Sequence, residues 1–176
     1  LHSHLIPAID DGVKSLDESI EIIKNMKALG YKKIITTPHI MSHRFPNRKD
    51  NILAGCELVK NELSKQNIDI ELQAAAEYYF DEYFIEKIRE KDLLTFGDNY
   101  VLFELSYTST PFGLEQIVFE LLQSGYKPIL AHPERYTYYS SSLEKYAGLK
   151  DMGLLFQINL NSLHKFYGAK PKLAAE

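Results

Sequence analysis

The sequence predicts an α/β fold in which parallel strands alternate with helices. Short runs rich in Ile, Val, Leu and Thr are separated by longer segments of helical periodicity, with about thirty residues from one strand to the next. Strands joined in this way by helices form βαβ units with right-handed crossovers, which makes neighbouring strands parallel. No repeat, low-complexity segment or linker interrupts the series, so we expect residues 1–176 to form a single domain.

The first elements have clear boundaries. The chain opens at Leu1 inside what reads as a strand, "LHSHLI", and we therefore expect the domain to be incomplete at this end. A helix follows over residues 15–30, where Ser15 and Glu18 form a capping box and Gly30 provides a C-terminal stop. The predicted apolar stripe of this helix consists of Ile22, Met26 and Leu29.

The remaining elements continue the alternation. "KIITTPH" reads as a buried strand that Pro38 ends, and a helix then covers about residues 50–66. Its buried side is predicted at Ile52, Cys56, Val59 and Leu63. Further strands are predicted in "IDIELQAAAE", "YVLFELS", "KPILAHPE" and "LLFQINLNS", and helices in "FDEYFIEKIRE", "LEQIVFELLQSGY" and "LEKYAGLKDMG".

Composition excludes several classes of protein. The net charge of −4 disfavours nucleic-acid binding, and no apolar run reaches the length of a membrane span. Because no signal peptide is evident either, we expect a cytoplasmic protein without membrane insertion. Cys56 is the one cysteine, which excludes disulfides and cysteine metal clusters. A cysteine-dependent phosphatase is also excluded, since it needs an arginine six residues after the thiolate, where this chain has Glu62.

Metal-ligand side chains recur at the carboxyl ends of the predicted strands. Active sites of α/β folds form at this edge, because the loops there converge. A His-X-His pair in extended backbone also points both imidazoles to one face. We therefore interpret the following residues as metal ligands: His2, His4, Asp11, His39, Glu77, Glu104 and His132.

Each of these residues has a plainer alternative. Asp11 precedes Gly12 and would also suit an Asx turn, and Glu77 could be an exposed loop acid. Glu104 is the more informative acid, because it lies inside an apolar strand where an unpaired carboxylate is costly. His43 and His164 fall outside the pattern and are expected at the surface. The tyrosine-rich segment 136–146 is expected to be a packed or substrate-facing loop.

The predicted ligands indicate phosphoester hydrolysis. Histidine and carboxylate ligands without thiolates suit manganese, iron or zinc, and the set exceeds the needs of a single tetrahedral ion. We expect two to three divalent ions, with Glu77 as a bridge and a metal-bound hydroxide as the nucleophile. Arg135, three residues after His132, is predicted to bind the phosphate, with a surface salt bridge as its alternative role.

The motifs "HSHLIPAIDDG", "TTPH", "AAE", "FEL" and "LAHPERY" occur in this order along almost the whole chain. In this the sequence resembles the polymerase and histidinol phosphatase (PHP) superfamily. It is most similar to the bacterial metal-dependent tyrosine phosphatases of capsule and exopolysaccharide synthesis. The resemblance implies a PHP-type distorted β/α barrel, TIM-like with parallel strands. It also implies three metal ions, often manganese, and as substrate the phosphotyrosine tail of a bacterial tyrosine kinase.

The family pattern assigns residues to the three ions. His2, His4 and Glu77 would bind the first ion. Glu77, Glu104 and His132 would bind the second, and Asp11 and His39 would contribute to the third. Arg135 would bind the phosphate. The resemblance thus makes a metal-binding role for Asp11 the preferred interpretation.

The sequence departs from the family in one respect. Family members carry an Asp-X-His pair on a late strand, and no such pair follows Asn159. We expect this chain to lack the last strand or strands of the barrel rather than to be an impaired variant, because its start also lies within a strand.

Other functions remain open at this point. One alternative is a PHP phosphatase for small monoesters such as histidinol phosphate. Another is a metal-binding regulatory module that is catalytically impaired because it lacks the Asp-X-His ligand pair. An amidohydrolase would share the opening His-X-His, but it expects a metal-bridging lysine on a middle strand, where this chain has Glu104. The sequence leaves open whether the chain forms a homo-oligomer.

Overall fold

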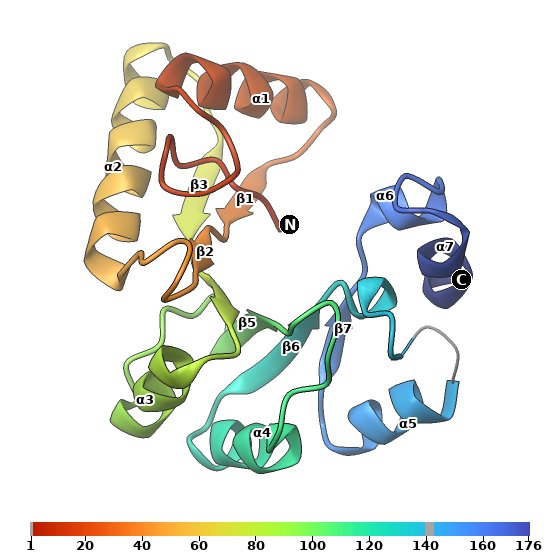
Figure 1. Cartoon of the computed structure of the whole chain (residues 1–176). Helices are drawn as coiled ribbons and strands as arrows, with labels where there is room; N and C mark the ends of the chain where they lie inside the picture. Colours follow the sequence, from red (N-terminus) through yellow and green to blue (C-terminus); the bar gives the residue numbers. More distant parts are fainter. Residues whose placement is uncertain (1, 140–142) are drawn as a thin grey trace. The chain divides into compact units, whose positions relative to one another are not determined.

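The computed structural model of the chain describes residues 2–139 and 143–176, and Figure 1 shows its helices and strands in chain order. The chain divides into two compact units. Unit 1 comprises Leu1–Glu77 and Leu93–Phe96, and unit 2 comprises Tyr78–Asp92 and Gly97–Glu176. Strands alternate with helices in both units, which confirms the predicted α/β class. Among the described residues, no helix combines the length and the apolar character needed to cross a membrane.

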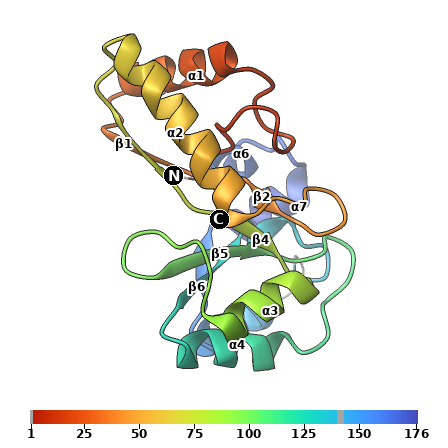
Figure 2. The same cartoon turned by 90° about the vertical axis from the view of Figure 1, so that its left-hand side faces the viewer.

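Unit 1 is built on a pair of parallel strands. Strand β1 (Lys33–Thr36) pairs with β3 (Glu71–Ala74), with Ile34 opposite Leu72. Helices α1 (Leu16–Ala28) and α2 (Lys49–Lys65) pack against each other, and α2 also covers β3, as Figure 2 shows. The short strand β2 (His39–Ile40) follows directly after Pro38.

The two helices of unit 1 differ in how well the sequence predicts them. The buried residues of α2 are the four predicted ones, Ile52, Cys56, Val59 and Leu63. The prediction for α1 was wrong: its buried residues are Ser19, Ile20 and Ile23, whereas Leu29 is 79% exposed. Ser19 can occupy a buried position because its hydroxyl donates to the carbonyl oxygen of Leu5 at 2.6 Å, which satisfies both polar groups.

The predicted first strand is not a strand in the structure. Residues 2–5 lie along the end of β1, and hydroxyl groups take part in most of the hydrogen bonds that join the two segments. Thr37 N donates to Ser3 O at 2.7 Å, whereas Leu5 N donates to the Thr36 hydroxyl at 2.9 Å. The Ser3 hydroxyl in turn donates to Ile35 O at 3.2 Å. Side chains thus help to hold the His-X-His segment beside β1.

Unit 2 contains four consecutive strands. Strand β4 (Glu77–Tyr79) begins at the last residue of unit 1, and β5 (Tyr100–Glu104), β6 (Lys127–Ala131) and β7 (Leu155–Gln157) follow beside it in that order. β5 pairs with β6 and β6 with β7, both in parallel. The helices of this unit are α3 (Glu82–Glu90), α4 (Leu114–Gln123), α5 (Leu143–Asp151), α6 (Leu160–Leu163), α7 (Ala169–Ala175) and the 3₁₀ turn η1 (Pro133–Arg135).

The core of unit 2 supports the carboxyl ends of its strands. Phe84 of α3 stacks on Phe103 of β5 with ring centroids 5.6 Å apart, and both side chains are fully buried. Helix α4 packs on β6 through a buried face that includes Ile117, Val118 and Leu121. Because the strands are parallel, Glu104 and Ala131 end β5 and β6 at the same edge of the sheet.

Candidate metal centre and phosphate-binding residues

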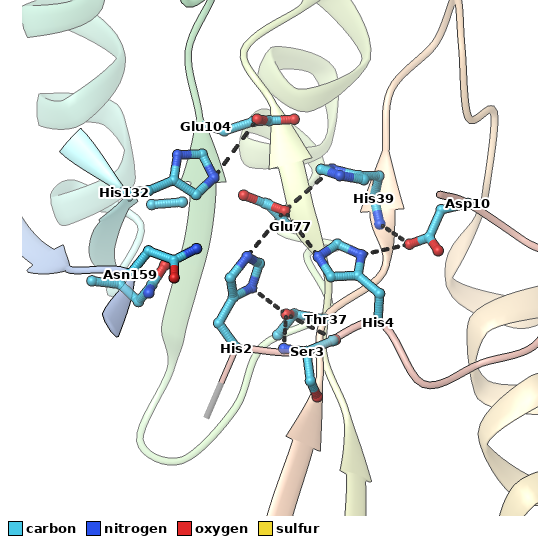
Figure 3. Close-up of polar contacts among 12 residues, drawn as sticks. His2, Ser3, His4, Asp10, Thr37, His39, Glu77, Glu104, His132 and Asn159 are labelled. Atoms are coloured by element: carbon cyan, nitrogen blue, oxygen red, sulfur yellow. Dashed lines mark hydrogen bonds and ion pairs between the residues drawn. The ribbon is translucent and has the colours of Figure 1, made fainter. Parts of the chain in front are cut away.

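Three histidines of unit 1 surround one buried carboxylate. Glu77 is 0% exposed and opens β4, directly after three small residues, Ala74–Ala76. Its Oε2 lies 3.5 Å from Nε2 of His2, 3.5 Å from Nε2 of His4 and 3.2 Å from Nδ1 of His39. Figure 3 shows these imidazoles converging on the Glu77 carboxylate. The expectation that His2 and His4 face the same side is therefore confirmed.

The donor atoms of this cluster have the spacing of ligands around a cation. Four ligands held at about 2.0–2.1 Å from a zinc-like ion lie about 3.3 Å from one another. The distances of 3.2–3.5 Å between Glu77 Oε2 and the three imidazole nitrogens match that separation. Ligand atoms of His2, His4 and Glu77 form one group in which all atoms lie within 4.8 Å of one another. The residues present in unit 1 therefore fit a divalent metal ion.

Asp11 joins a second group of the same kind. Ligand atoms of His4, Asp11 and His39 also lie within 4.8 Å of one another. Asp11 Oδ1 is 3.4 Å from His39 Nε2, and its side chain is 53% exposed, so the carboxylate is open to an ion from solvent. The Asx turn that we considered for Asp11 is made instead by Asp10, whose Oδ1 accepts from Gly12 N at 2.9 Å.

Asp10 orients the histidines, a role that the sequence analysis missed. His4 Nδ1 donates to Asp10 Oδ2 at 2.7 Å, which leaves Nε2 directed at Glu77, and the backbone N–H of His39 donates to the same oxygen at 3.0 Å. Burial opposes ionisation of Asp10, but the hydrogen bond and charge of His4 and the N–H groups of Gly12 and His39 outweigh burial and lower the pKa of its carboxyl. A carboxylate behind an imidazole fixes the tautomer of a metal-binding histidine.

Gly12 and Thr37 complete the support of the histidines. A Cβ atom at Gly12 would lie 2.4 Å from the carbonyl oxygen of His4, so only glycine permits this close approach. Thr37 Oγ1 lies 2.7 Å from His2 Nδ1 and thereby leaves His2 Nε2 for the Glu77 side. The sequence contained a signal for Gly12, which follows the two aspartates, but none that distinguished Thr37 from Thr36.

Unit 2 carries a second carboxylate and histidine pair. Glu104 ends β5 and is 2% exposed, and its Oε2 lies 3.9 Å from His132 Nε2 (Figure 3). Tyr107, which the sequence analysis did not single out, donates its hydroxyl to Glu104 Oε2 at 3.5 Å and stacks on the His132 ring at 5.7 Å. Glu104 is thus buried beside polar partners, and its role as a metal ligand stays a prediction.

Backbone geometry sets the position of His132. This residue follows β6 in the left-handed region, with φ 34° and ψ 53°, a conformation that costs energy for a residue other than glycine. Its N–H donates to Gln157 O at 2.7 Å. Tyr136 links the carboxyl ends of β5 and β6. Its hydroxyl accepts a hydrogen bond from Leu105 N at 3.0 Å and donates one to Ala131 O at 2.9 Å. The strained turn therefore holds the imidazole beside Glu104.

The structure also places the other predicted residues. Arg135 ends η1 and lies over the rings of Tyr107 and Tyr167, so the surface salt bridge considered for it is absent from the part of the chain that the structure describes. His43 and His164 are exposed, as predicted. In the tyrosine-rich segment, Tyr136 and Tyr139 are buried, which confirms its packed character there, and residues 140–142 lie outside the described residues.

Comparison with known proteins places these features in a family. CapC from Staphylococcus aureus is 30% identical over 96% of this chain and 66% of its own length. The tyrosine-protein phosphatase CpsB from Streptococcus agalactiae is 28% identical over 94% of this chain and 68% of its own length. The chain thus spans about two thirds of the length of these relatives.

A solved structure and a family model cover almost all of the chain. The solved structure comes from a crystallographic study of YwqE from Bacillus subtilis and CpsB from Streptococcus pneumoniae. That study describes both proteins as unique metal-dependent tyrosine phosphatases. The solved structure matches with a TM-score of 0.86 and 27% identity, over 97% of this chain and 70% of the other. The model for capsular polysaccharide synthesis proteins of the CpsB/CapC type matches residues 1–176. The chain therefore belongs to the CpsB/CapC family of capsular polysaccharide synthesis proteins.

Proposed function

We propose that this chain carries a metal-dependent phosphatase that hydrolyses phosphotyrosine on proteins. The observation that carries the proposal is the buried Glu77 carboxylate with three imidazole nitrogens 3.2–3.5 Å from one of its oxygens. The relatives support it, because CpsB and YwqE are tyrosine-protein phosphatases and their solved structures are described as metal-dependent.

Each unit carries its own proposed metal ligands. In unit 1 we propose as ligands His2, His4, Asp11, His39 and Glu77. In unit 2 we propose Glu104 and His132. Two to three divalent ions, manganese in preference to iron or zinc, would lower the pKa of water to give a hydroxide nucleophile and offset the charge of the phosphate.

The side chains have distinct tasks around that chemistry. The imidazoles offer nitrogen donors whose ring orientation depends on a second contact, in His4 with Asp10 and in His2 with Thr37. Burial of Glu77 and Glu104 strengthens their attraction for cations, because a buried carboxylate has little competing hydration. Arg135 would bind the phosphate and stabilise the charge that develops on it.

The family context suggests the substrate and the setting. Because the CpsB/CapC model describes capsular polysaccharide synthesis, we propose as substrate the phosphotyrosine tail of a bacterial tyrosine kinase that controls capsule or exopolysaccharide production. This proposal places the reaction in the cytoplasm. It requires neither nucleic acid nor membrane insertion, and it is compatible with a homo-oligomer.

The test uses a phosphotyrosine peptide and metal-stripped protein to which manganese is restored. We expect hydrolysis to depend on manganese, and Arg135→Ala to lower kcat/KM by about 100-fold, the typical effect of losing one charge-stabilising donor. Arg89→Ala removes an exposed arginine that pairs with Glu120 and serves as the matched control. It should retain the activity of the unchanged protein.

The other outcomes identify the alternatives. Faster hydrolysis of histidinol phosphate than of the peptide would assign the chain to small-ester chemistry. Metal binding without turnover of either substrate would identify a regulatory module. Equal loss of activity in Arg89→Ala and Arg135→Ala would contradict the phosphate role of Arg135.

A further inference from the structure

Unit 2 contains a cavity beside the proposed phosphate-binding arginine. Its volume is about 460 Å³, within the range of sites for small ligands. The turn η1 contributes Glu134 and Arg135 to its lining, and the loop after β5 contributes Tyr107. Tyr167 lies just before α7, and Lys170 lies in the first turn of that helix. Contacts between η1 and α7 hold the two sides together.

Arg135 lines this cavity and lies over two aromatic rings. Its guanidinium carbon is 4.7 Å from the ring centroid of Tyr107 and 4.2 Å from that of Tyr167. Among the described residues, no carboxylate lies within ion-pair distance of this guanidinium. A guanidinium that stacks on rings uses its faces, and its N–H groups remain available in the plane for bidentate contact with an anion.

A buried network contacts the hydroxyl group of Tyr167. Glu134 is 1% exposed, and its Oε1 accepts from the backbone N–H of Asn159 at 3.1 Å and from the Ser162 hydroxyl at 2.7 Å. Asn159 Nδ2 in turn donates to the Tyr167 hydroxyl at 3.2 Å. The residue next to Arg135 in sequence is thus connected through Asn159 to the ring that stacks on Arg135.

The charge of the cavity favours an anion with an apolar body. Arg135 and Lys170 carry two positive charges and Glu134 carries one negative charge, which leaves a net of one positive charge. The remaining lining includes the rings of Tyr107 and Tyr167 and the apolar side chains of Ala169 and Pro171. An aryl phosphate combines the anionic group and the flat apolar surface that these residues match.

We propose that Tyr107 and Tyr167 are specificity-determining residues whose rings lie against Arg135, so that the cavity selects aryl phosphates over alkyl phosphates. This inference rests on the proposed function and deepens it by naming the residues beside Arg135 that would confer the preference for an aryl phosphate. Tyr107 also connects the cavity to the proposed metal ligands of unit 2, because its hydroxyl donates to Glu104 and its ring stacks on His132.

The test measures binding of two phosphonates, which the protein cannot hydrolyse, by calorimetry with manganese present. Phenylphosphonate and methylphosphonate share the anionic group, so the ratio of their Kd values isolates the contribution of the ring. We expect the unchanged protein to bind phenylphosphonate about tenfold more tightly. Tyr167→Leu should reduce this preference about fivefold, since a ring contact of this kind contributes up to about tenfold in affinity.

Three further variants make the result specific. Tyr107→Leu should also reduce the preference, whereas Tyr167→Phe keeps the ring and should retain most of it. Tyr83→Leu is the matched control, because Tyr83 also has a cation over its ring, Lys87 at 5.4 Å, but does not line the cavity. An equal loss in Tyr167→Phe and Tyr167→Leu would overturn the stacking role.

The two proposals fail in different ways. If the unchanged protein hydrolyses no phosphotyrosine peptide but prefers phenylphosphonate, and Tyr167→Leu loses that preference, the proposed function is wrong and the aryl-selective cavity stands. If hydrolysis occurs but phenylphosphonate and methylphosphonate bind equally, or Tyr167→Leu keeps the preference, the aryl-selective cavity is wrong.

Discussion

At the scale of single residues, Asp10 shows how a buried acid can serve a metal centre without being a predicted ligand. It is 8% exposed, and its two oxygens accept hydrogen bonds from the His4 ring and from the N–H groups of Gly12 and His39. Its neighbour Asp11 points toward His39 and has a half-exposed side chain. Adjacent aspartates thus have different tasks, which their burial and partners determine.

Asp10→Asn should weaken metal binding without removing a proposed ligand. The amide cannot carry the negative charge that fixes the His4 tautomer, and loss of such a carboxylate typically lowers metal affinity by about 10- to 100-fold. Calorimetric titration with manganese measures the change. Asp69→Asn replaces an exposed aspartate of the same unit and is the control. Unchanged affinity in Asp10→Asn would show that Asp10 does not orient the site.

At the scale of elements, the N-terminus of α1 has one of the two hydrogen bonds of the predicted capping box, and the other goes to a different residue. Ser15 is the N-cap, and its hydroxyl accepts from Glu18 N at 3.2 Å, as predicted. The Glu18 carboxylate, however, accepts from Lys14 N at 2.6 Å, one residue before the position that a capping box requires. Glu18 therefore provides a hydrogen-bond acceptor for the backbone N–H of Lys14, the residue before the N-cap.

Helix α2 contains a glycine that tertiary packing explains. Gly55 lies in the helix, where alanine would normally be more stable by up to about 1 kcal/mol. A Cβ atom at this position would meet Ile6 Cγ2 at 2.3 Å, and Ile6 is 1% exposed and has little room to move. The glycine thus allows α2 to pack closely on the segment that follows the His-X-His pair.

Gly55→Ala should therefore destabilise the protein, by about 1–3 kcal/mol, because overpacking exceeds the gain in helix propensity. Gly148→Ala is the matched control: Gly148 also lies in a helix, α5, and a Cβ there has no neighbour within 4 Å. That variant should gain about 0.5–1 kcal/mol. Denaturant unfolding of the two variants measures both free energies, and a more stable Gly55→Ala protein would contradict the packing argument.

At the scale of the whole molecule, folding creates the candidate metal centre from distant parts of the chain. Within unit 1, the histidines and Glu77 are separated by up to 75 positions in sequence, from His2 to Glu77. The unfolded chain therefore has no such site, and an ion that binds only the folded protein stabilises it.

Manganese should raise the melting temperature of the metal-stripped protein. At a concentration of about 100 times Kd the expected gain is about 2.7 kcal/mol, or roughly 5–10 °C for a chain of this size. Scanning calorimetry with and without manganese measures the shift, and EDTA should reverse it. His39→Asn should lose most of the shift, whereas His43→Asn, at an exposed position outside the clusters, should keep it. Identical shifts in both variants would exclude His39 as a ligand.

Much of the fold and of the candidate site could be predicted from the sequence, because both depend on local patterns. The periodicity of α2 predicted its buried residues, and the alternation of strand and helix signals predicted parallel pairing. The His-X-His spacing predicted that two imidazoles share a face, as the distances of His2 and His4 to Glu77 show. In each case the side chain's direction follows from the period of its own segment.

Only the tertiary structure decided the features that depend on contacts between segments. Ser19 is buried because the carbonyl group of Leu5 needs a donor, and Asp10 rather than Asp11 accepts from His4 because the turn brings its carboxylate there. The Tyr167 ring lies over Arg135, and Asn159 contacts its hydroxyl group. Composition and periodicity describe one segment at a time, whereas these hydrogen bonds and ring contacts depend on which other segment lies opposite.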